Sequence, residues 1–254
     1  MQDLHFEQQG AIAIVTLDAP PVNALSLKRY QAIAELFTQI SAMESVNVVI
    51  LTAKGQKAFC AGLDLKEFLA ATPEQDPERA LVVRACFEAI RHCAVPVIAA
   101  VNGPALGAGS VLAACADIRI ASDKAIFSMP EINVGRCGGG AHHGRLLPQG
   151  ALRLMAFTGE PISATEAYRL GFIEKISTSR LLMPTALDLA QHIAAKSRIG
   201  LVKMKEALNQ IESMPVDEGY KVEQGFSTVL MHTEDAREAT RAVVEKRAPV
   251  FVGR

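Results

Sequence analysis

The chain has 254 residues, of which 50% are hydrophobic and 21% are charged, with a formal net charge of −1, as expected for a globular protein with one large core or a core and a smaller appendage. The near-neutral charge excludes nucleic-acid binding driven by bulk electrostatics. No apolar run reaches the roughly 18 residues of a membrane span, and the N-terminus lacks a signal-peptide pattern, so we expect a cytoplasmic protein without a membrane partner.

Strand and helix patterns alternate over roughly the first 130 residues, which predicts an α/β layer structure. Alternating β-branched residues predict a strand at 11–17, and Ser26 is a suitable N-cap for an amphipathic helix that continues to about Met43. Further strands are expected at 47–52, 95–101 and 117–121, with helices at 78–92 and 105–114 and a polar loop at 72–77.

The strand signal fades after about residue 145, and the C-terminal part reads as mainly helical. Acidic residues in the first turn after Thr233 favour a helix start at that position. We predict helices at 181–195, 200–211, 216–230 and 233–246.

Two segments rich in small residues, 59–67 and 102–110, each follow a buried strand and each open a helix. Loops without side-chain bulk let backbone amides approach a ligand, and a helix N-terminus favours negative charge. Two such loops can place two N–H donors around one developing oxyanion. Neither loop has a known phosphate-binding spacing, and a tight strand-to-helix connection explains either loop taken singly.

Taken together, these loops resemble those of the enoyl-CoA hydratase/isomerase (crotonase) family. The matching pieces follow the family order over essentially the whole chain: 20–25, 59–67, 99–110, 115–121, 130–132, 158–164 and 245–251. The resemblance implies an α/β fold, a crotonase-like spiral of repeated ββα units, in a core over residues 1–190. It also implies a helical region at 191–254 that makes trimer contacts, often within a dimer of trimers, and covers the active site.

By the same resemblance, two backbone amides hold the thioester oxygen of an acyl-CoA, and the motifs place them at Leu63 and Ala108. Proton transfer beside a thioester carbonyl gives an enolate whose charge collects on this oxygen. Two preorganised donors in a dry pocket lower that barrier by about 3–4 kcal/mol each. Substrate contacts are expected from Val22, Ala61, Gly62, Asp64, Lys66, Gly107, Val111 and Gly139. Lys28, Lys246 and Phe251 are weaker candidates for CoA contacts.

The family commonly carries two glutamates beside the reacting carbons, and here only one of them is matched. Glu131 corresponds to the second, whereas Val111 stands where the first is expected. A single carboxylate still suffices to move a proton from Cα to Cγ of a 3-enoyl-CoA, so isomerisation to the 2-enoyl-CoA is the preferred interpretation. Burial beside apolar groups is expected to raise the pKa of Glu131, although an early-helix glutamate is often just solvated.

Several alternatives stay open at this point. They are hydration of a 2-enoyl-CoA, decarboxylation of a malonyl-type CoA thioester, and a non-catalytic acyl-CoA-binding protein. We expect no metal or redox cofactor, because CoA arrives as part of the substrate and the chain has no C-x-x-C pair among its five cysteines.

A cysteine hydrolase is a further alternative, because Cys137 precedes the adjacent pair His142 and His143 closely. Adjacent helix residues point about 100° apart, so at most one of these rings can face the site. We favour a surface histidine pair with one ring packed, and a thiol without a catalytic role.

Overall fold

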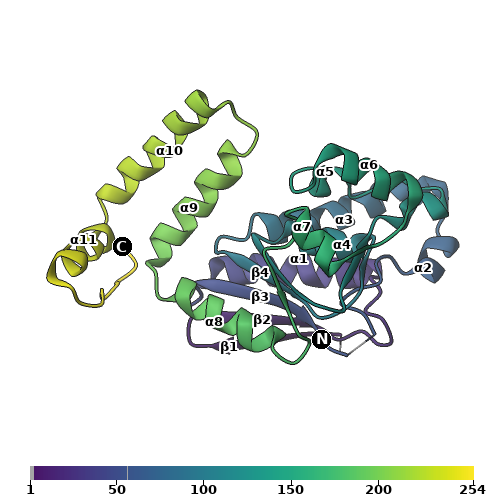
Figure 1. The fold of residues 1–254 in the computed structure, drawn as a ribbon, viewed down its shortest axis with the longest axis horizontal. Helices are drawn as coiled ribbons and strands as arrows, with labels where there is room; N and C mark the ends of the chain where they lie inside the picture. The colour runs from purple at the N-terminus through teal and green to yellow at the C-terminus, as the bar shows by residue number, and fades with distance from the viewer. Residues whose placement is uncertain (1–2, 56) are drawn as a thin grey trace.

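The computed structural model describes residues 3–55 and 57–254, in which a main β-sheet is covered by helices on both faces (Figure 1). Its strand order in these residues is β1–β2–β3–β4–β6–β9; β1 and β2 are antiparallel, and the other neighbours are parallel. The strands are β1 (Leu4–Gln9), β2 (Ile12–Leu17), β3 (Val48–Ala53), β4 (Val97–Val101), β6 (Ile118–Ser122) and β9 (Lys175–Ser177).

The central strands β3 and β4 are buried along their whole length, which explains their continuous apolar runs. One face of the sheet packs on α1 (Leu27–Ala42), α3 (Asp76–Arg91) and α4 (Ala108–Cys115). The opposite face packs on α8 (Leu182–Ala194), which presents Leu182, Ala186 and Ala190 at four-residue steps.

A second, smaller sheet lies beyond the strand ends and shapes the loops of interest. It contains β5 (Ala105–Leu106), β7 (Ile126–Ser128) and β8 (Ile162–Ser163), in the order β5–β7–β8. Helix α7 (Ala164–Arg169) packs against β7 and β8. The other short helical elements are α2 (Leu65–Ala70), α5 (Gly140–His143), α6 (Gln149–Thr158) and the 3-10 turns η1 (Pro73–Gln75) and η2 (Pro130–Val134).

The last three helices, α9 (Arg198–Ile211), α10 (Val216–Met231) and α11 (Glu234–Glu245), extend away from this body (Figure 1). Buried Lys205 on α9 anchors them, because its ammonium lies 2.7 Å from Asp117 and 3.1 Å from the carbonyl oxygen of Val95. Large apolar side chains remain exposed on α10 and α11, including Val216, Tyr220, Met231, Val243 and Val244. Within the described part of the chain, no helix is long and apolar enough to cross a membrane.

The predicted α/β organisation and the helical C-terminal part are confirmed, but two local predictions need correction, and the strands β1, β7, β8 and β9 were not predicted. No strand was predicted at Leu4–Gln9, because β1 is an exposed edge strand with mostly polar residues. The helix expected at 105–114 begins only at Ala108, since residues 105–106 pair with β7 and Gly107 has a φ of 52°, outside helical space. The loop expected at 72–77 contains η1 and the first turn of α3.

Candidate active site

The two small-residue loops meet with main chain pressed directly against main chain. A β-carbon on Gly109 would lie 2.1 Å from the carbonyl oxygen of Cys60, so no side chain fits at this position. A β-carbon on Gly62 would lie 2.7 Å from the carbonyl oxygen of Leu106 and 3.3 Å from the amide nitrogen of Ala108. The glycines are therefore needed for the close approach that brings residues 62 and 108 together.

Two backbone amides at this junction stay free. Leu63 pairs with Leu25 in a parallel bridge in which Leu25 bonds to residues 62 and 64, so the amide of Leu63 points away from that partner. Ala108 is the first residue of α4, where helix amides have no intrahelical acceptor. Among the described residues, neither amide donates a hydrogen bond.

The segment around Val22 is hydrogen-bonded to the first loop. The carbonyl of Val22 accepts from the amide of Ala61 at 3.0 Å, and the carbonyl of Gly62 accepts from the amide of Leu25 at 2.7 Å. Buried Asn23, with a φ of 54°, accepts from the amide of Ala19 and donates to the carbonyl of Ala58. Sequence reasoning missed this role, although an asparagine after two prolines is a recognisable turn signal.

Glu131 lies on the first turn of η2, just after Pro130, and its carboxyl group reaches the second loop. A β-carbon on Gly107 would lie 3.0 Å from Oε1 of Glu131, so any side chain there would crowd the carboxylate, and the φ of 52° at this position also favours glycine. Oε2 is buried and has no hydrogen-bond partner among the described residues. Burial raises the pKa of Glu131 above its ordinary value, opposed only by a hydrogen bond from its own amide.

Val111 and the turn at Gly138 and Gly139 complete the wall beside Glu131. Val111 is buried, and its Cγ2 would lie 2.9 Å from a β-carbon on Gly139. A β-carbon on Gly138 would lie 3.5 Å from Cγ of Glu131. One carboxylate and one apolar side chain thus pack against the same glycine turn.

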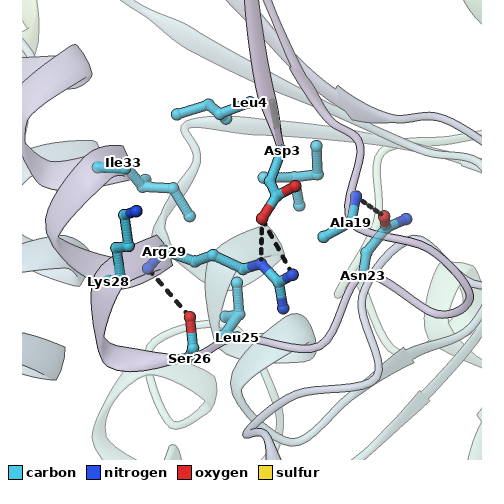
Figure 2. Close-up of a pocket in the computed structure, with 11 residues that line it drawn as sticks. Asp3, Leu4, Ala19, Asn23, Leu25, Ser26, Lys28, Arg29 and Ile33 are labelled. Carbon is cyan, nitrogen blue, oxygen red and sulfur yellow. Dashed lines mark hydrogen bonds and ion pairs between the residues drawn. The ribbon is translucent and has the colours of Figure 1, made fainter. Parts of the chain in front are cut away.

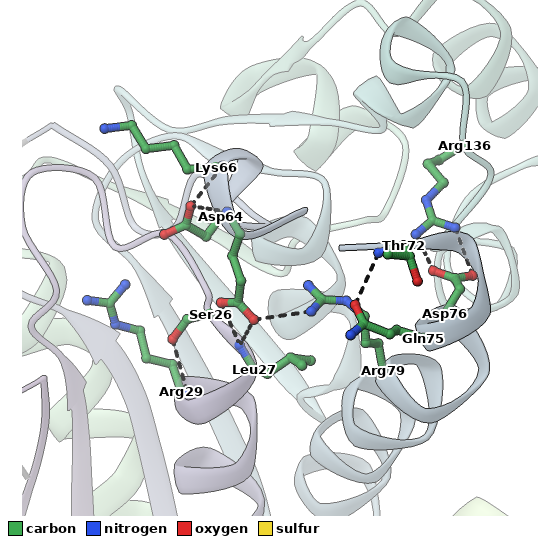
Figure 3. Close-up of polar contacts among 11 residues, drawn as sticks. Ser26, Leu27, Arg29, Asp64, Lys66, Thr72, Gln75, Asp76, Arg79 and Arg136 are labelled. Atoms are coloured by element: carbon green, nitrogen blue, oxygen red, sulfur yellow. Dashed lines mark hydrogen bonds and ion pairs between the residues drawn. The ribbon is translucent and has the colours of Figure 1, made fainter. Parts of the chain in front are cut away.

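Asp64 and Lys66 lie at the start of α2, next to Leu63. The Asp64 carboxylate caps this helix by accepting from the amides of Lys66 and Glu67, whereas Lys66 is exposed (Figure 3). Glu67 in turn accepts from the amide of Leu27 and pairs with Arg79 at 3.4 Å. These contacts fix α2, and with it the amide of Leu63, to the ends of α1 and α3.

The histidine pair is more deeply packed than the surface pair that we favoured. The ring of His143 is fully buried, and the half-buried ring of His142 lies edge-on to Phe87 with its Nδ1 at 3.5 Å from Sγ of Cys115. Nε2 of His143 is hydrogen-bonded to Ser110, and Nδ1 of the same ring is hydrogen-bonded to the carbonyl oxygen of Gly139. Cys137 is exposed. Neither ring is hydrogen-bonded to Cys137, which argues against a cysteine–histidine pair.

A cavity of about 320 Å³ lies beside the segment that carries Val22 (Figure 2). Asn23, Ser26 and Lys28 line it, together with Arg29 and Asp3, which form an ion pair. Among the residues predicted for catalysis or substrate contact, Lys28, a weaker candidate for CoA contact, lines this cavity, whereas Leu63, Ala108 and Glu131 do not. The described residues contain no group of three or more histidine, cysteine or acidic side chains that could hold a metal ion.

Known proteins are similar to this chain over its whole length, in both sequence and structure. The enoyl-CoA hydratase/isomerase family matches residues 7–254. Carnitinyl-CoA dehydratase of Salmonella typhi is 36% identical over 100% of this chain and 99% of its own length. The crystal structure of an enoyl-CoA hydratase from Bacillus anthracis superposes with a TM-score of 0.96 at 32% identity, covering 100% of both chains. An enoyl-CoA hydratase/carnitine racemase from Magnetospirillum magneticum superposes with a TM-score of 0.92 at 32% identity, over 100% of this chain and 97% of its own.

Proposed function

This chain belongs to the enoyl-CoA hydratase/isomerase family and has its crotonase fold, and within that family we propose that it isomerises 3-enoyl-CoA to 2-enoyl-CoA. The family acts on acyl-CoA thioesters. The observation that carries the proposal is the position of Glu131, whose Oε2 is buried without a partner among the described residues, beside buried Val111 on the same glycine turn.

The amides of Leu63 and Ala108 serve as the oxyanion hole in this proposal. Their support is that neither amide donates a hydrogen bond within residues 3–55 and 57–254, and that both belong to backbone segments in direct contact. Two such donors, fixed before the reaction, stabilise the enolate oxygen by about 3–4 kcal/mol each. Because only main-chain atoms are needed, the side chains at positions 63 and 108 take no part in the chemistry.

Glu131 then acts as the single acid and base. Its carboxylate takes a proton from Cα of the 3-enoyl-CoA, and the electron pair of that C–H bond moves into the thioester to form a dienolate. The same proton returns from Glu131 to Cγ, the double bond moves from C3–C4 to C2–C3, and the carboxylate is regenerated. A pKa raised by burial suits this exchange near neutral pH.

Hydration of a 2-enoyl-CoA, with Glu131 alone activating water, is the second candidate. The names of similar proteins favour it, since those from Salmonella typhi and Bacillus anthracis are called a dehydratase and a hydratase. Val111 weighs against it, because an apolar side chain cannot share in orienting the water. Decarboxylation and non-catalytic acyl-CoA binding use the same oxyanion hole and are decided by the experiment below.

For substrate binding, we propose that the CoA moiety lies along Val22, Ala61 and Gly62, with exposed Lys66 near its phosphates. The acyl group faces Gly107, Val111 and Gly139. No metal or redox cofactor enters the reaction. Residues 191–254 are proposed to form the oligomerisation region of a homotrimer or dimer of trimers, because apolar side chains on α10 and α11 are exposed.

Product analysis by mass, on a panel of 2-enoyl-CoA, 3-enoyl-CoA and malonyl-type CoA thioesters, tests the proposal. An isomerase converts 3-enoyl substrates without mass change, a hydratase adds the mass of water, and a decarboxylase removes carbon dioxide. Glu131→Gln is expected to lower turnover about 100-fold or more, whereas Cys137→Ala leaves it unchanged. Binding without turnover of any thioester would leave only the non-catalytic function.

A further inference from the structure

Ser110 and His143 form a buried hydrogen-bonded bridge behind the candidate active site. Oγ of Ser110 lies 2.7 Å from Nε2 of His143, and Nδ1 of the same ring lies 2.9 Å from the carbonyl oxygen of Gly139. Both side chains are 0% exposed. The bridge therefore connects α4 to the glycine turn without any contact with bulk water.

The positions of the hydrogens follow from the partners. A carbonyl oxygen can only accept, so Nδ1 of His143 carries the hydrogen and donates it to Gly139. In the neutral ring, Nε2 is then the acceptor, and the hydroxyl of Ser110 donates to it. Burial lowers the pKa of His143 to about 4, with a smaller contribution from neighbouring His142, so the ring is neutral at physiological pH.

This pair is not a second nucleophilic site. A serine nucleophile needs an accessible hydroxyl and a base that can gain a proton, whereas this hydroxyl is buried and this ring resists protonation. The ring also stacks on Phe172, with centroids 5.3 Å apart and planes within 10° of parallel. The pair has the properties of a rigid support.

The bridge joins the two parts of the proposed catalytic machinery. Ser110 lies on the first turn of α4, between Ala108 and Val111. At the other end, Gly139 packs against Val111, and the preceding Gly138 packs against Glu131. Any movement of the glycine turn relative to α4 therefore changes the surroundings of the Glu131 carboxylate.

We propose that His143 is a positioning residue, which holds the Gly138–Gly139 turn against Glu131 and so sets the place of the carboxylate relative to the helix that carries the Ala108 amide. This inference rests on the proposed role of Glu131 as acid and base. The bridge acts through Glu131, and His143 touches neither substrate nor reacting atoms.

The test uses the double variant Ser110→Ala, His143→Phe, which removes the polar bridge, leaves no buried polar side chain unpaired, and keeps an aromatic ring on Phe172. The melting temperature is expected to stay near that of the wild type, while kcat falls roughly 10- to 100-fold because the carboxylate is misplaced. The acid limb of kcat/KM moves to lower pH, since a loosened turn admits water to Glu131 and reduces its desolvation. Ser122→Ala is the matched control, because Ser122 is equally buried and binds Ser179 at 2.8 Å, and its hydroxyl has no hydrogen bond to Ser110, His143 or Glu131.

A double variant with wild-type kcat and an unmoved acid limb overturns the inference, as does a pH profile that moves equally in Ser122→Ala. If the double variant does not fold, side-chain ¹⁵N NMR of the wild type decides, because the bridge requires the Nδ1–H tautomer of one histidine and an Nε2–H ring contradicts it. Equal activity of wild type and Glu131→Gln would refute the proposed function instead, and the NMR result would then still report on the bridge itself.

Discussion

The wall that carries Leu63 and Ala108 is made of main chain pressed on main chain, whereas the wall that carries Glu131 is made of side chains. On the first wall, Gly62 and Gly109 leave no room for any substituent. On the second, a carboxylate and Val111 meet across a glycine turn. The comparison implies that the main-chain wall tolerates almost no change, while the second wall can exchange side chains and so, in the proposed function, alter the reaction within one fold.

Substitution of Gly109 by alanine should have the largest effect of all. Its β-carbon would lie 2.1 Å from the carbonyl oxygen of Cys60, and backbone on both sides must move to relieve this overlap. We expect a loss of about 3 kcal/mol in the free energy of unfolding, or more. Turnover should fall at least about 100-fold in any protein that folds, because the two amides separate. Denaturant unfolding and steady-state kinetics measure the two effects.

Gly150→Ala provides the control for this substitution. Gly150 lies in α6 with open space around its α-carbon, so alanine should be neutral or slightly stabilising there. Wild-type stability of Gly109→Ala would show that the two loops are not in the close contact on which the first wall depends.

The second wall is tested by the pH dependence of Glu131. Because burial raises the pKa of this carboxyl in the folded state, its contribution to stability is fully present below the unfolded pKa and is lost as pH rises through the folded pKa. Glu131→Gln should therefore gain stability relative to the wild type between pH 4 and pH 8, while losing activity about 100-fold or more. Unfolding at the two pH values and the acid limb of kcat/KM measure these changes.

Glu166→Gln should show the opposite trend and serves as the reference. A hydrogen bond from Arg169 lowers the pKa of Glu166, so this carboxylate contributes stability above its unfolded pKa that is lost as pH falls. If the stability of both variants relative to the wild type changed in the same direction with pH, Glu131 would not be desolvated in solution.

The two walls also differ in how far the sequence alone could predict them. A main-chain site leaves glycines at fixed positions, and both loops were identified from that pattern, whereas the family resemblance placed the amides of the proposed oxyanion hole at Leu63 and Ala108. The family resemblance similarly placed Val111 and Glu131. The roles of all four residues stay predictions, but the structure places Leu63 and Ala108 on one wall and Val111 and Glu131 on the adjoining wall.

Contacts between side chains far apart in the chain left no local signal. Ser110 ends the second small-residue loop and His143 belongs to the adjacent histidine pair, yet nothing in the sequence indicates that these two side chains are hydrogen-bonded. The hydrogen bond from the Leu27 amide to Glu67, which helps to cap α1, was not predicted for the same reason. A helix start is normally recognised from residues next to it in the sequence. Edge strand β1 was missed because exposed polar residues do not show the alternation of a half-buried strand.

Val111→Glu tests whether a side chain on the second wall selects the reaction. A second carboxylate beside Glu131 can help to orient water, so the ratio of hydrated to isomerised product should rise about tenfold or more. Burying this charge should also cost about 2–4 kcal/mol of stability, unless the introduced carboxyl stays protonated. Product analysis by mass gives the ratio directly.

Val111→Gln is the matched control, because it has the same shape without the charge. It should be destabilised less and should leave the product ratio near that of the wild type. An unchanged ratio in a folded Val111→Glu protein would count against the role assigned to this position.

The smallest effect is expected at Arg136, at the outer end of the second wall. Its guanidinium pairs with Asp76 and lies 4.5 Å from the centre of the Phe68 ring, and so links the segment after Glu131 to α2 and α3 (Figure 3). A solvent-exposed ion pair and one cation–π contact near the surface are both weak interactions. Arg136→Met should therefore raise KM roughly two- to fivefold and leave kcat almost unchanged.

Asp76→Asn separates the two contacts, because it weakens the ion pair and keeps the guanidinium over Phe68. Its effect on KM should be smaller than that of Arg136→Met, and raised salt should reduce the difference between Asp76→Asn and the wild type. A fall in kcat of tenfold or more in Arg136→Met would mean that Arg136 helps to position the Glu131 carboxylate. The side-chain wall would then be as intolerant of change as the main-chain wall, because a link at its outer end would be fixing the carboxylate itself.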